Sequence, residues 1–500
     1  MKLMDVVRPL LSTRERVSVL AGLTAAYMLV QTSSLPVALS LPSLSESFET
    51  GVDDAAWIVI AYLVMVGSLV LLSARLGDRF GHINVFFIGI IISFISSIPM
   101  AFAQELWNIV ALRAVAGVGA SLVMGNANAI LASTFSPEER GRAFSIPIIG
   151  ARFGTLIGLV AFSVFLHFLN WRWVFGTFVP IGLIAILVSL PMLKYREQAI
   201  AGRVNQPVDW IGGILLAASA IILVLSGTHL HGGEESFVSS DGLKYHLPMH
   251  TLFLILLALF VLVELRVPNP VIRMSHFREK YFSMSLGSNV TYHFSMVATM
   301  TLIPILVEDG FGKSPLFVPI VLLPSQSLGL FVPMIAGWMY DKYHPKLMRP
   351  ITLTMIAAGF LTLGLLVEHV SFWMLPLLML PISIGTNMFN PINNATVMNS
   401  LALEHRGVAS GMLETTREMG HALGATAAAS ALALAIPVGI ELISGDVAKD
   451  FYMQGFRGSS LMVVITLMFG ATLAYFHKEY LSKPDYDGEV KTSPDTSSRG

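Results

Sequence analysis

The sequence predicts an all-α polytopic membrane protein of about fourteen transmembrane helices, arranged as two six-helix halves with two further helices between them. Hydrophobic residues make up 54% of the chain and charged residues only 13%, whereas soluble domains carry about 25% charged residues. Mean hydropathy is +0.70. Apolar runs long enough to cross a bilayer recur along the chain, and two pairs of motifs repeat at nearly the same offset, which indicates a duplication.

The predicted spans follow one another, with short polar turns between the first six. These six begin near Val17, Asp54, Ile83, Leu106, Gly141 and Trp173. Two more runs, 209–227 and 251–264, flank the polar segment HLHGGEESFVSSDGLKYHLP. The last six begin near Tyr281, Pro315, Pro350, Trp373, Gly407 and Gly458. The expected domains are a cytoplasmic lead (1–16), a six-helix half (17–193), a linker with two extra helices (194–280), a second six-helix half (281–477) and a disordered cytoplasmic tail (478–500).

The distribution of basic residues predicts the orientation. With the N-terminus inside, roughly 23 of the 31 Lys and Arg lie at cytoplasmic span ends and about 5 lie outside. The even number of spans then places both termini in the cytoplasm, and we expect a multi-pass protein of the plasma (inner) membrane. A net charge of -1 gives no indication of a nucleic-acid partner. The absence of cysteine excludes disulfides and thiolate chemistry.

Two pairs of segments repeat between the halves. ARLGDRFGH at 74–82 aligns with GWMYDKYHP at 337–345, and RGRAFSIPIIGARFGTLIG at 140–158 aligns with RGVASGMLETTREMGHALG at 406–424. The alignments pair Asp78 with Asp341, Arg79 with Lys342, Arg140 with Arg406, Gly154 with Gly420 and Gly158 with Gly424. Paired helical halves are typical of secondary transporters, which bind substrate near the midplane between the halves and alternate access by rocking one half against the other.

Several motifs resemble those of a known family. The loop motif G-x-L-x-D-R-x-G-R is similar to Ala74, Leu76, Asp78, Arg79, Gly81 and His82, with Ala74 and His82 departing from it. LRAVAGVGAS carries Arg113, Gly117 and Gly119 of a fourth-span motif, and DWIGGILLAASAIILVLSG is similar to a seventh helix. Over nearly its whole length the chain resembles the major facilitator superfamily, and within it the fourteen-helix drug/proton antiporter branch.

The resemblance implies the major facilitator fold and a proton-coupled exporter of hydrophobic or amphipathic compounds that works by alternating access. Two segments depart from the branch. The Asp usual in helix one is absent from a stretch whose polar residues are Gln31, Ser33 and Ser34. The fifth-helix motif G-x-x-x-G-P-x-x-G-G keeps Gly154 and Gly158 but has Leu159, Phe162 and Ser163 at its last positions. A symporter of an organic anion or nutrient, and a non-transporting receptor on the same fold, therefore stay open as alternatives.

The repeated loop residues are candidate gating residues: Asp78, Arg79, Asp341 and Lys342. A carboxylate just beyond a span can cap a neighbouring helix or pair with a basic group, and so stabilise one conformation. The alternative is that they only mark topology. Arg113 joins this group, because an arginine within a span costs a few kcal/mol unless it is satisfied inside the bundle; its role could equally be structural.

The stretch GMLETTREMGHALG contains four polar residues on one helix face. Glu414, Arg417, Glu418 and His421 follow the i, i+3, i+4, i+7 spacing. From Arg406 they lie between about 12 and 22 Å along the helix, which straddles the midplane of a 30 Å core. Arg417 can pair with Glu414, and with His421 if it is neutral, while the two carboxylates compete for one proton. We expect a proton-coupling site; the alternatives are a permanent structural ion pair and direct contact with substrate.

Uncharged polar residues of the first and fourth helices of each half are the candidate substrate ligands, as the resemblance implies. Interhelical hydrogen bonding is the alternative role for each of them. Pro391 is expected to break its helix and expose backbone to a cavity. The candidates are Gln31, Asn126, Asn289, Tyr292, His293, Asn387, Asn390 and Asn394, with Asn128 and Asn393 nearby.

Arg152 lies in the fifth span, one position off register from Arg417, and has no acidic neighbour at helical spacing. It is free to attract an anionic group if no acid from another helix meets it. An enzyme is not expected, because metal-spaced clusters, the G-x-S-x-G elbow and phosphate-binding loops are absent. The expected partners are a small hydrophobic or amphipathic substrate, the proton and the lipid bilayer, for a monomer without cofactor or metal.

Overall fold

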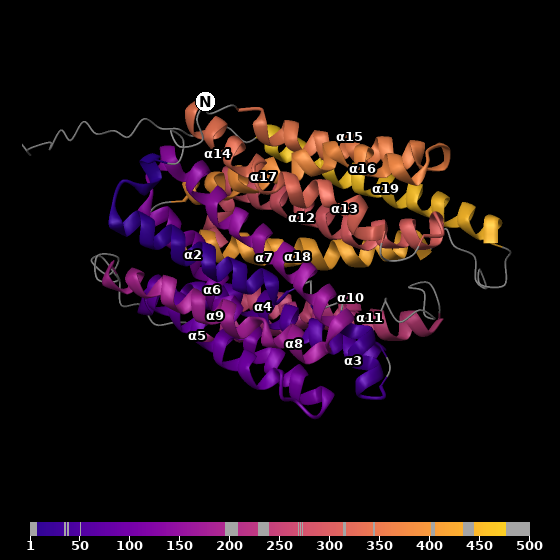
Figure 1. Ribbon diagram of the computed structural model, residues 1–500. Helices are drawn as coiled ribbons and strands as arrows, with labels where there is room; N and C mark the ends of the chain where they lie inside the picture. Colours follow the sequence, from indigo (N-terminus) through magenta and orange to yellow (C-terminus); the bar gives the residue numbers. More distant parts are fainter. Residues whose placement is uncertain are drawn as a thin grey trace, which may run out of the picture.

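The computed structural model describes residues 8–34, 37, 40–50, 52–195, 209–228, 240–268, 270, 272, 274–313, 317–343, 346–401, 406–433 and 445–476. Every regular element within these ranges is a helix (Figure 1). The predicted tail 478–500 and most of the loop between the two linker helices lie outside the described residues. The all-α class predicted from composition is therefore confirmed for the part of the chain that the structure describes.

The first group of helices, called here the N-terminal half, runs from α2 to α9. Gly81, with φ 102°, reverses the chain between α4 and α5 in a single residue, a conformation that glycine adopts without steric strain. The helices are α2 (Arg14–Thr32), α3 (Leu41–Ser47), α4 (Val52–Phe80), α5 (His82–Met100), α6 (Leu106–Thr134), α7 (Arg140–Phe168), α8 (Trp171–Gly176) and α9 (Phe178–Ser189).

The second group, the C-terminal half, runs from α12 to α19, with α10 (Trp210–Thr228) and α11 (Ser240–Glu264) between the two groups in sequence. The helices are α12 (Lys280–Ile305), α13 (Val318–Leu328), α14 (Val332–Tyr343), α15 (Met348–Leu366), α16 (Leu375–Leu378), α17 (Leu380–Asn399), α18 (Arg406–Ala433) and α19 (Gly445–Phe476). α10 packs against α11, α4 and α18.

The same helix pairs pack together in each half. α7 lies against α2 as α18 lies against α12, and α6 contacts α4 and α5 as α17 contacts α14 and α15. The aligned glycines mediate equivalent contacts: a Cβ on Gly154 would lie 2.5 Å from the Met28 carbonyl oxygen of α2, and one on Gly420 would lie 2.6 Å from the Val290 carbonyl oxygen of α12. Small residues allow such close helix approach in membranes. These contacts support the duplication inferred from the motifs.

Eleven helices of the described chain are long and apolar enough to cross a membrane. The other three predicted spans correspond to α2, α10 and α18, which are helical but do not meet the same length and hydropathy criteria. Charged residues inside α2 and α18 lower their hydropathy, and the apolar part of α10 is short. The structure thus supports a multi-pass helical membrane protein without confirming the count of fourteen.

Helix bounds differ from the predicted spans at several places. α11 and α19 begin at Ser240 and Gly445, before the predicted starts at 251 and 458. The prediction that Pro391 breaks its helix is wrong, because α17 continues through it. Proline removes one backbone donor, but a transmembrane helix tolerates this when neighbouring groups satisfy the freed carbonyl. Backbone instead departs from α-helix at 329–331, between α13 and α14.

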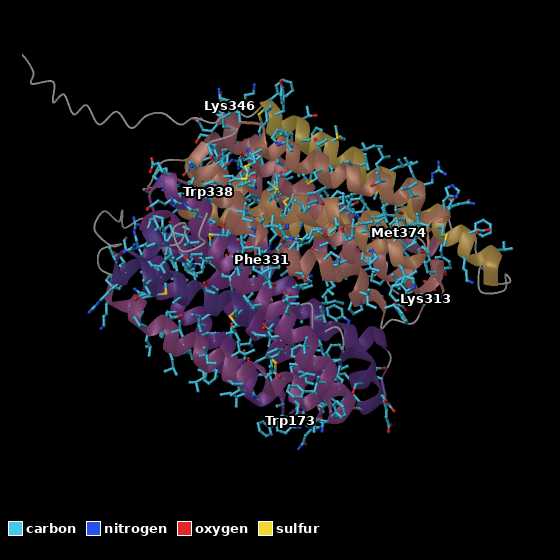
Figure 2. All side chains as sticks on the ribbon, turned by 45° about the horizontal axis from the view of Figure 1, so that its top comes forward. Trp173, Lys313, Phe331, Trp338, Lys346 and Met374 are labelled. Atoms are coloured by element: carbon cyan, nitrogen blue, oxygen red, sulfur yellow. The ribbon has the colours of Figure 1, made fainter. Side chains whose placement is uncertain are left out.

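The two halves lie side by side, with α7 and α18 near their boundary (Figure 1). One apolar cluster joins the N-terminal half to the parts of α14, α17 and α18 nearest Asp341, including Tyr340, Met398 and Met412. A second cluster contains residues of the C-terminal half only, such as Phe360. The halves therefore share a core at the Asp341 end. Figure 2 shows Trp338 and Lys346 near that end of the C-terminal half, and Lys313 and Met374 near the other.

Candidate functional site

The four polar residues of α18 form one connected group, called here the α18 stripe. Arg417 Nη1 lies 2.6 Å from Glu414 Oε2, and Arg417 Nη2 lies 2.7 Å from Glu418 Oε1. Arg417 Nε also donates to Glu418 Oε1 at 3.0 Å. His421 Nδ1 lies 3.5 Å from Glu418 Oε2. Arg417 therefore pairs with both carboxylates, and its expected pairing with His421 is replaced by a contact between His421 and Glu418.

The α18 stripe touches the N-terminal half. Asn128 Nδ2 in α6 donates to Glu414 Oε1 at 3.0 Å, and Arg417 Nη2 contacts Met124 Sδ at 3.2 Å. Glu418 packs on α4, where a Cβ on Gly67 would lie 3.1 Å from Glu418 Cγ. The stripe is thus placed at the interface between the halves, where a change of charge acts on the contact between them.

Exposure is lowest at Glu414 and highest at His421, the member of the stripe farthest from the Asp341 end. The side chain of Glu414 is 6% exposed, those of Arg417 and Glu418 are 15% and 13%, and that of His421 is 28%. The shared apolar core lies at the Glu414 side of this gradient. The charged group is therefore closed toward the Asp341 end and more open toward the opposite end.

A histidine pair extends the stripe into α12. His293 Nδ1 lies 3.1 Å from His421 Nε2, and the two rings meet edge to face with centroids 5.0 Å apart. Since one of these two nitrogens must carry the hydrogen, the contact fixes complementary tautomers. Together with the contact of His421 to Glu418 it forms a chain of titratable side chains from α18 to α12.

Tyr292, the neighbour of His293, lies in an aromatic and polar environment. Its ring centroid is 4.7 Å from that of Phe389, and its hydroxyl donates to the Thr386 carbonyl at 3.1 Å. Asn390 and Arg152 lie close enough to Tyr292 to interact with it electrostatically. The structure therefore brings together Tyr292, His293, Asn390 and Arg152 from α12, α17 and α7.

Arg152 reaches from α7 toward the C-terminal half. Its Nη1 lies 3.5 Å from Gln326 Oε1 of α13, and its side chain packs on Gly329. No carboxylate of the described residues forms an ion pair with it. Asn387 lies on the other side of Gly329; its Nδ2 donates to the Ser325 and Ser383 carbonyls at 3.0 and 2.8 Å, while its buried Oδ1 receives no hydrogen bond.

Other candidate ligands have structural partners instead. Asn289 Nδ2 donates to the Leu413 carbonyl and to Thr416 Oγ1, both at 2.9 Å, and its Oδ1 accepts from Asn393 Nδ2 at 3.0 Å. Asn393 Oδ1 in turn accepts from Arg349 Nη2 at 2.8 Å. This network joins α12, α15, α17 and α18, so the amide of Asn289 is already occupied by contacts between helices.

Asn126 lies away from the α18 stripe and from Arg152. Its Nδ2 donates to the Ser73 and Leu122 carbonyls at 3.1 and 2.9 Å, and its Oδ1 lies 2.7 Å from His82 Nδ1. Asn126 therefore joins α6 to the turn between α4 and α5. Gln31 and Asn394 are half-buried, and their side chains form no hydrogen bond or ion pair with the described residues.

The Asp341 carboxylate caps a helix of the opposite half. It accepts hydrogen bonds from the backbone N–H groups of Gly141 at 2.8 Å and Arg142 at 3.0 Å, and from Arg142 Nε at 2.8 Å. Gly141 and Gly337 bring the two backbones together, since a Cβ on either would overlap the other chain segment. A carboxylate at a helix N-terminus is stabilised by the helix dipole. Arg142 is a partner that the motif alignment did not indicate.

Asp78 lies at the equivalent place in the repeat, where α4 meets the start of α18. Its carboxylate occupies the space that a Cβ on Gly407 would need. It also pairs with Arg75 Nη1 and with His82 Nε2, each at 3.3 Å. The two repeated aspartates thus lie against the first turns of α18 and α7, at the end where the halves share a core.

The basic members of the predicted gating group lie elsewhere. The Arg79 guanidinium carbon is 5.3 Å from the Phe80 ring centroid, and Lys342 Nζ is 5.1 Å from the ring centroids of Trp338 and Tyr343. Neither forms an ion pair with the described residues.

Arg113 is fully buried near the opposite end of the molecule. Its Nε donates to the Ile58 carbonyl at 2.9 Å and its Nη1 to the Ser33 carbonyl at 2.5 Å, and its guanidinium stacks on Tyr62, 4.1 Å from the ring centroid. The structure does not bring it together with Asp78 or Asp341.

Comparison with known proteins places this geometry in a family. The chain is 23% identical over 383 residues to the riboflavin transporter RibZ of Clostridioides difficile (strain 630), covering 77% of this chain and 81% of the relative. It is 25% identical over 376 residues to multidrug resistance protein 3 of Bacillus subtilis (strain 168), covering 75% and 71%.

Solved structures show the same fold. The proton:xylose symporter XylE bound to 6-bromo-6-deoxy-D-glucose superposes with a TM-score of 0.63 at 14% identity, covering 92% of this chain and 96% of XylE. The sequence profile of the Major Facilitator Superfamily matches residues 21–425, which include Asp78, Asp341 and the α18 stripe. The chain belongs to the Major Facilitator Superfamily.

Proposed function

We propose that this chain is a proton-coupled exporter of hydrophobic or amphipathic compounds that works by alternating access. In this proposal it has fourteen transmembrane helices, acts as a monomer in the plasma (inner) membrane, and has both termini in the cytoplasm. The observation that carries the proposal is the α18 stripe, in which Glu414 and Glu418 share Arg417 at the interface between the halves. The relatives that transport riboflavin and that confer multidrug resistance support transport of small organic compounds.

The charge of the stripe requires a proton or another cation. Two carboxylates and one guanidinium leave one excess negative charge, and an unbalanced charge at membrane depth costs several kcal/mol. Glu418 contacts Arg417 Nε, Arg417 Nη2 and His421, whereas Glu414 contacts Arg417 Nη1 and Asn128. Because Arg417 donates two hydrogen bonds to Glu418, Glu414 is the carboxylate that we assign to carry the proton.

Protonation of Glu414 acts on the contact between the halves. The hydrogen bond from Asn128 is charge-assisted only while Glu414 is ionised, and such bonds are roughly twice as strong as neutral ones. A proton on Glu414 therefore weakens the link between α6 and α18 near the closed end. His421, the most exposed member of the stripe, lies on the side away from the Asp341 end, where protons enter and substrate leaves in this proposal.

The test is proton-gradient-driven transport in proteoliposomes. Glu414→Gln keeps the shape of the side chain and removes the titrating group, so substrate movement should no longer depend on the pH gradient. Glu308→Gln, in the π-helical turn Leu306–Gly310 that follows α12, is the matched control and should retain that dependence. Unchanged gradient dependence in Glu414→Gln would overturn the assignment of the proton.

Symport of an organic anion is a second candidate function, which Arg152 favours. An anion at Arg152 would make the site more negative and strengthen proton binding to the α18 stripe. The anion and the proton would then bind together and cross the membrane in the same direction. A cation at the stripe would displace the proton instead. Proton uptake on binding an amphipathic anion, in place of proton release on binding a cation, would therefore select the symporter.

A further inference from the structure

Arg152 and Glu418 occupy equivalent positions in the two halves. The motif alignment pairs Gly154 with Gly420, so the residue two places earlier in α7, Arg152, pairs with Glu418 in α18. Each side chain packs on a glycine of the other half: a Cβ on Gly67 would lie 3.1 Å from Glu418 Cγ, and a Cβ on Gly329 would lie 3.0 Å from Arg152 Cγ. The duplicated fold thus places opposite charges at the same depth of its two halves.

The two charges differ in how they are satisfied. Glu418 is within 2.7 Å of Arg417 and 3.5 Å of His421. Arg152 has a long contact of 3.5 Å to Gln326, and no ion pair with the described residues. It lies about 18 Å along α7 from Arg140, deep in the span, yet its side chain is only half-buried. A guanidinium at this depth needs water or an anion as a partner.

A second polar atom beside Arg152 lacks a partner. Asn387 is 1% exposed and its Oδ1 receives no hydrogen bond. The space that a Cβ on Gly329 would fill lies 3.0 Å from Arg152 Nε and 3.0 Å from Asn387 Oδ1. The backbone there departs from α-helix, which membrane proteins tolerate where the segment is buried in protein or lines a cavity. Arg152 and Asn387 therefore flank Gly329 closely, with a donor on one side and an acceptor on the other.

We propose that Arg152, Asn387 and Gly329 form the subsite for the anionic group of a zwitterionic amphipath, whose cationic group lies toward Glu418. The guanidinium pairs with the anionic group, and Asn387 Oδ1 accepts a hydrogen bond from a hydroxyl or N–H beside it. Gly329 allows both side chains to approach the turn after α13, since a Cβ there would crowd Arg152 and Asn387. Tyr292 and His293 lie between the two charges, since Tyr292 interacts with Arg152 and His293 contacts His421.

This inference rests on the proposed function, because the cationic group of the substrate competes with the proton at the α18 stripe. A zwitterion satisfies both charges at once and leaves the site neutral when the proton departs. A cation alone leaves Arg152 without an anion, and an anion alone adds a negative charge and retains the proton. Charge complementarity thus predicts that the zwitterion binds more tightly than a cation or an anion with the same chain.

The test compares three probes that share a dodecyl chain, with the full-length protein in nanodiscs. They are a dodecyl sulfobetaine, dodecyltrimethylammonium and dodecyl sulfate, each titrated below its micellar concentration by calorimetry. Arg152→Gln should weaken sulfobetaine binding about 10- to 100-fold, as loss of a charge-assisted contact does, while dodecyltrimethylammonium changes less than about twofold. Arg152→Lys should recover part of the loss. Gly329→Ala should weaken sulfobetaine selectively although Arg152 is retained.

Arg14→Gln, which removes an exposed arginine at the start of α2, is the matched control and should leave all three affinities unchanged. Equal losses for sulfobetaine and dodecyltrimethylammonium in Arg152→Gln would overturn the subsite, as would a wild type that does not prefer the sulfobetaine. The two proposals fail separately. Selective sulfobetaine binding without proton release supports the subsite and contradicts proton coupling, whereas proton release with an unaffected Arg152→Gln supports coupling and contradicts the subsite.

Discussion

Replacing Asp341 by Asn should open the end of the molecule at which the halves share a core. The carboxylate accepts two backbone hydrogen bonds from the start of α7 and one from Arg142 Nε. Asparagine can still accept hydrogen bonds but removes the charge that strengthens them and that interacts with the helix dipole. The expected loss is about 1 to 3 kcal/mol, which lowers the ratio of closed to open molecules about 5- to 150-fold.

The separation of the two halves at this end can be measured by spin labelling. Because the sequence contains no cysteine, two introduced cysteines carry the only labels. Phe80 and Leu347 are suitable positions, since they are 51% and 50% exposed and belong to opposite halves near this end. Spin-label distances should shift to longer values in Asp341→Asn and stay unchanged in Lys342→Gln, whose cation rests on aromatic rings. An unchanged distribution in a folded Asp341→Asn protein would refute the reasoning.

Three further results are expected from thermal and chemical unfolding. Gly424→Ala should destabilise the fold by about 1 to 3 kcal/mol, because its Cβ would collide with the Phe294 carbonyl of α12. Gly458→Ala is the control: a Cβ there meets nothing within 4 Å, so the substitution should be neutral or slightly stabilising. Asn289→Leu should cost about 0.6 to 1.7 kcal/mol without altering which substrates bind, and a change of selectivity would contradict its structural role. Arg113→Gln should destabilise the protein and leave the Phe80–Leu347 label distance unchanged, since Arg113 satisfies carbonyls at the other end.

Much of the fold could be predicted from the sequence because hydropathy and repetition are local and additive signals. The aligned motifs placed Asp78 and Asp341 in equivalent positions, and both lie against a helix start of the other half. The count of spans is harder to read, because α18 must carry charged residues in the interior and so loses the hydropathy that identifies a span. The charged residues that we propose for function in α18 are the same residues that hide it from a hydropathy-based prediction of spans.

The candidate site could be predicted only as far as one helix extends. Spacing placed Glu414, Arg417, Glu418 and His421 on one face, and they do contact one another. Which partners they meet on other helices depends on tertiary packing, so sequence alone could not identify the contact of His421 with His293 or that of Glu414 with Asn128.

The amide residues show the same limit. Asn126 and Asn289 are of the type that binds substrates, yet their side chains are occupied by carbonyls and polar groups of neighbouring helices. Gln326 and Gly329 could not be predicted as site residues, because each matters only through its contact with Arg152. α17 continues through Pro391, whereas the interruption at 329–331 lies between Pro324 of α13 and Pro333 of α14, so a proline alone did not indicate which helix is interrupted.

The central claim is that one proton on the α18 stripe competes with substrate. The most direct measurement is the number of protons released when dodecyltrimethylammonium binds the purified protein in weakly buffered nanodiscs, followed with a pH indicator. The wild type should release up to one proton per molecule bound, and Glu414→Gln should bind the cation without releasing a proton. Equal proton release from both proteins, or binding to the wild type without any release, would contradict the claim.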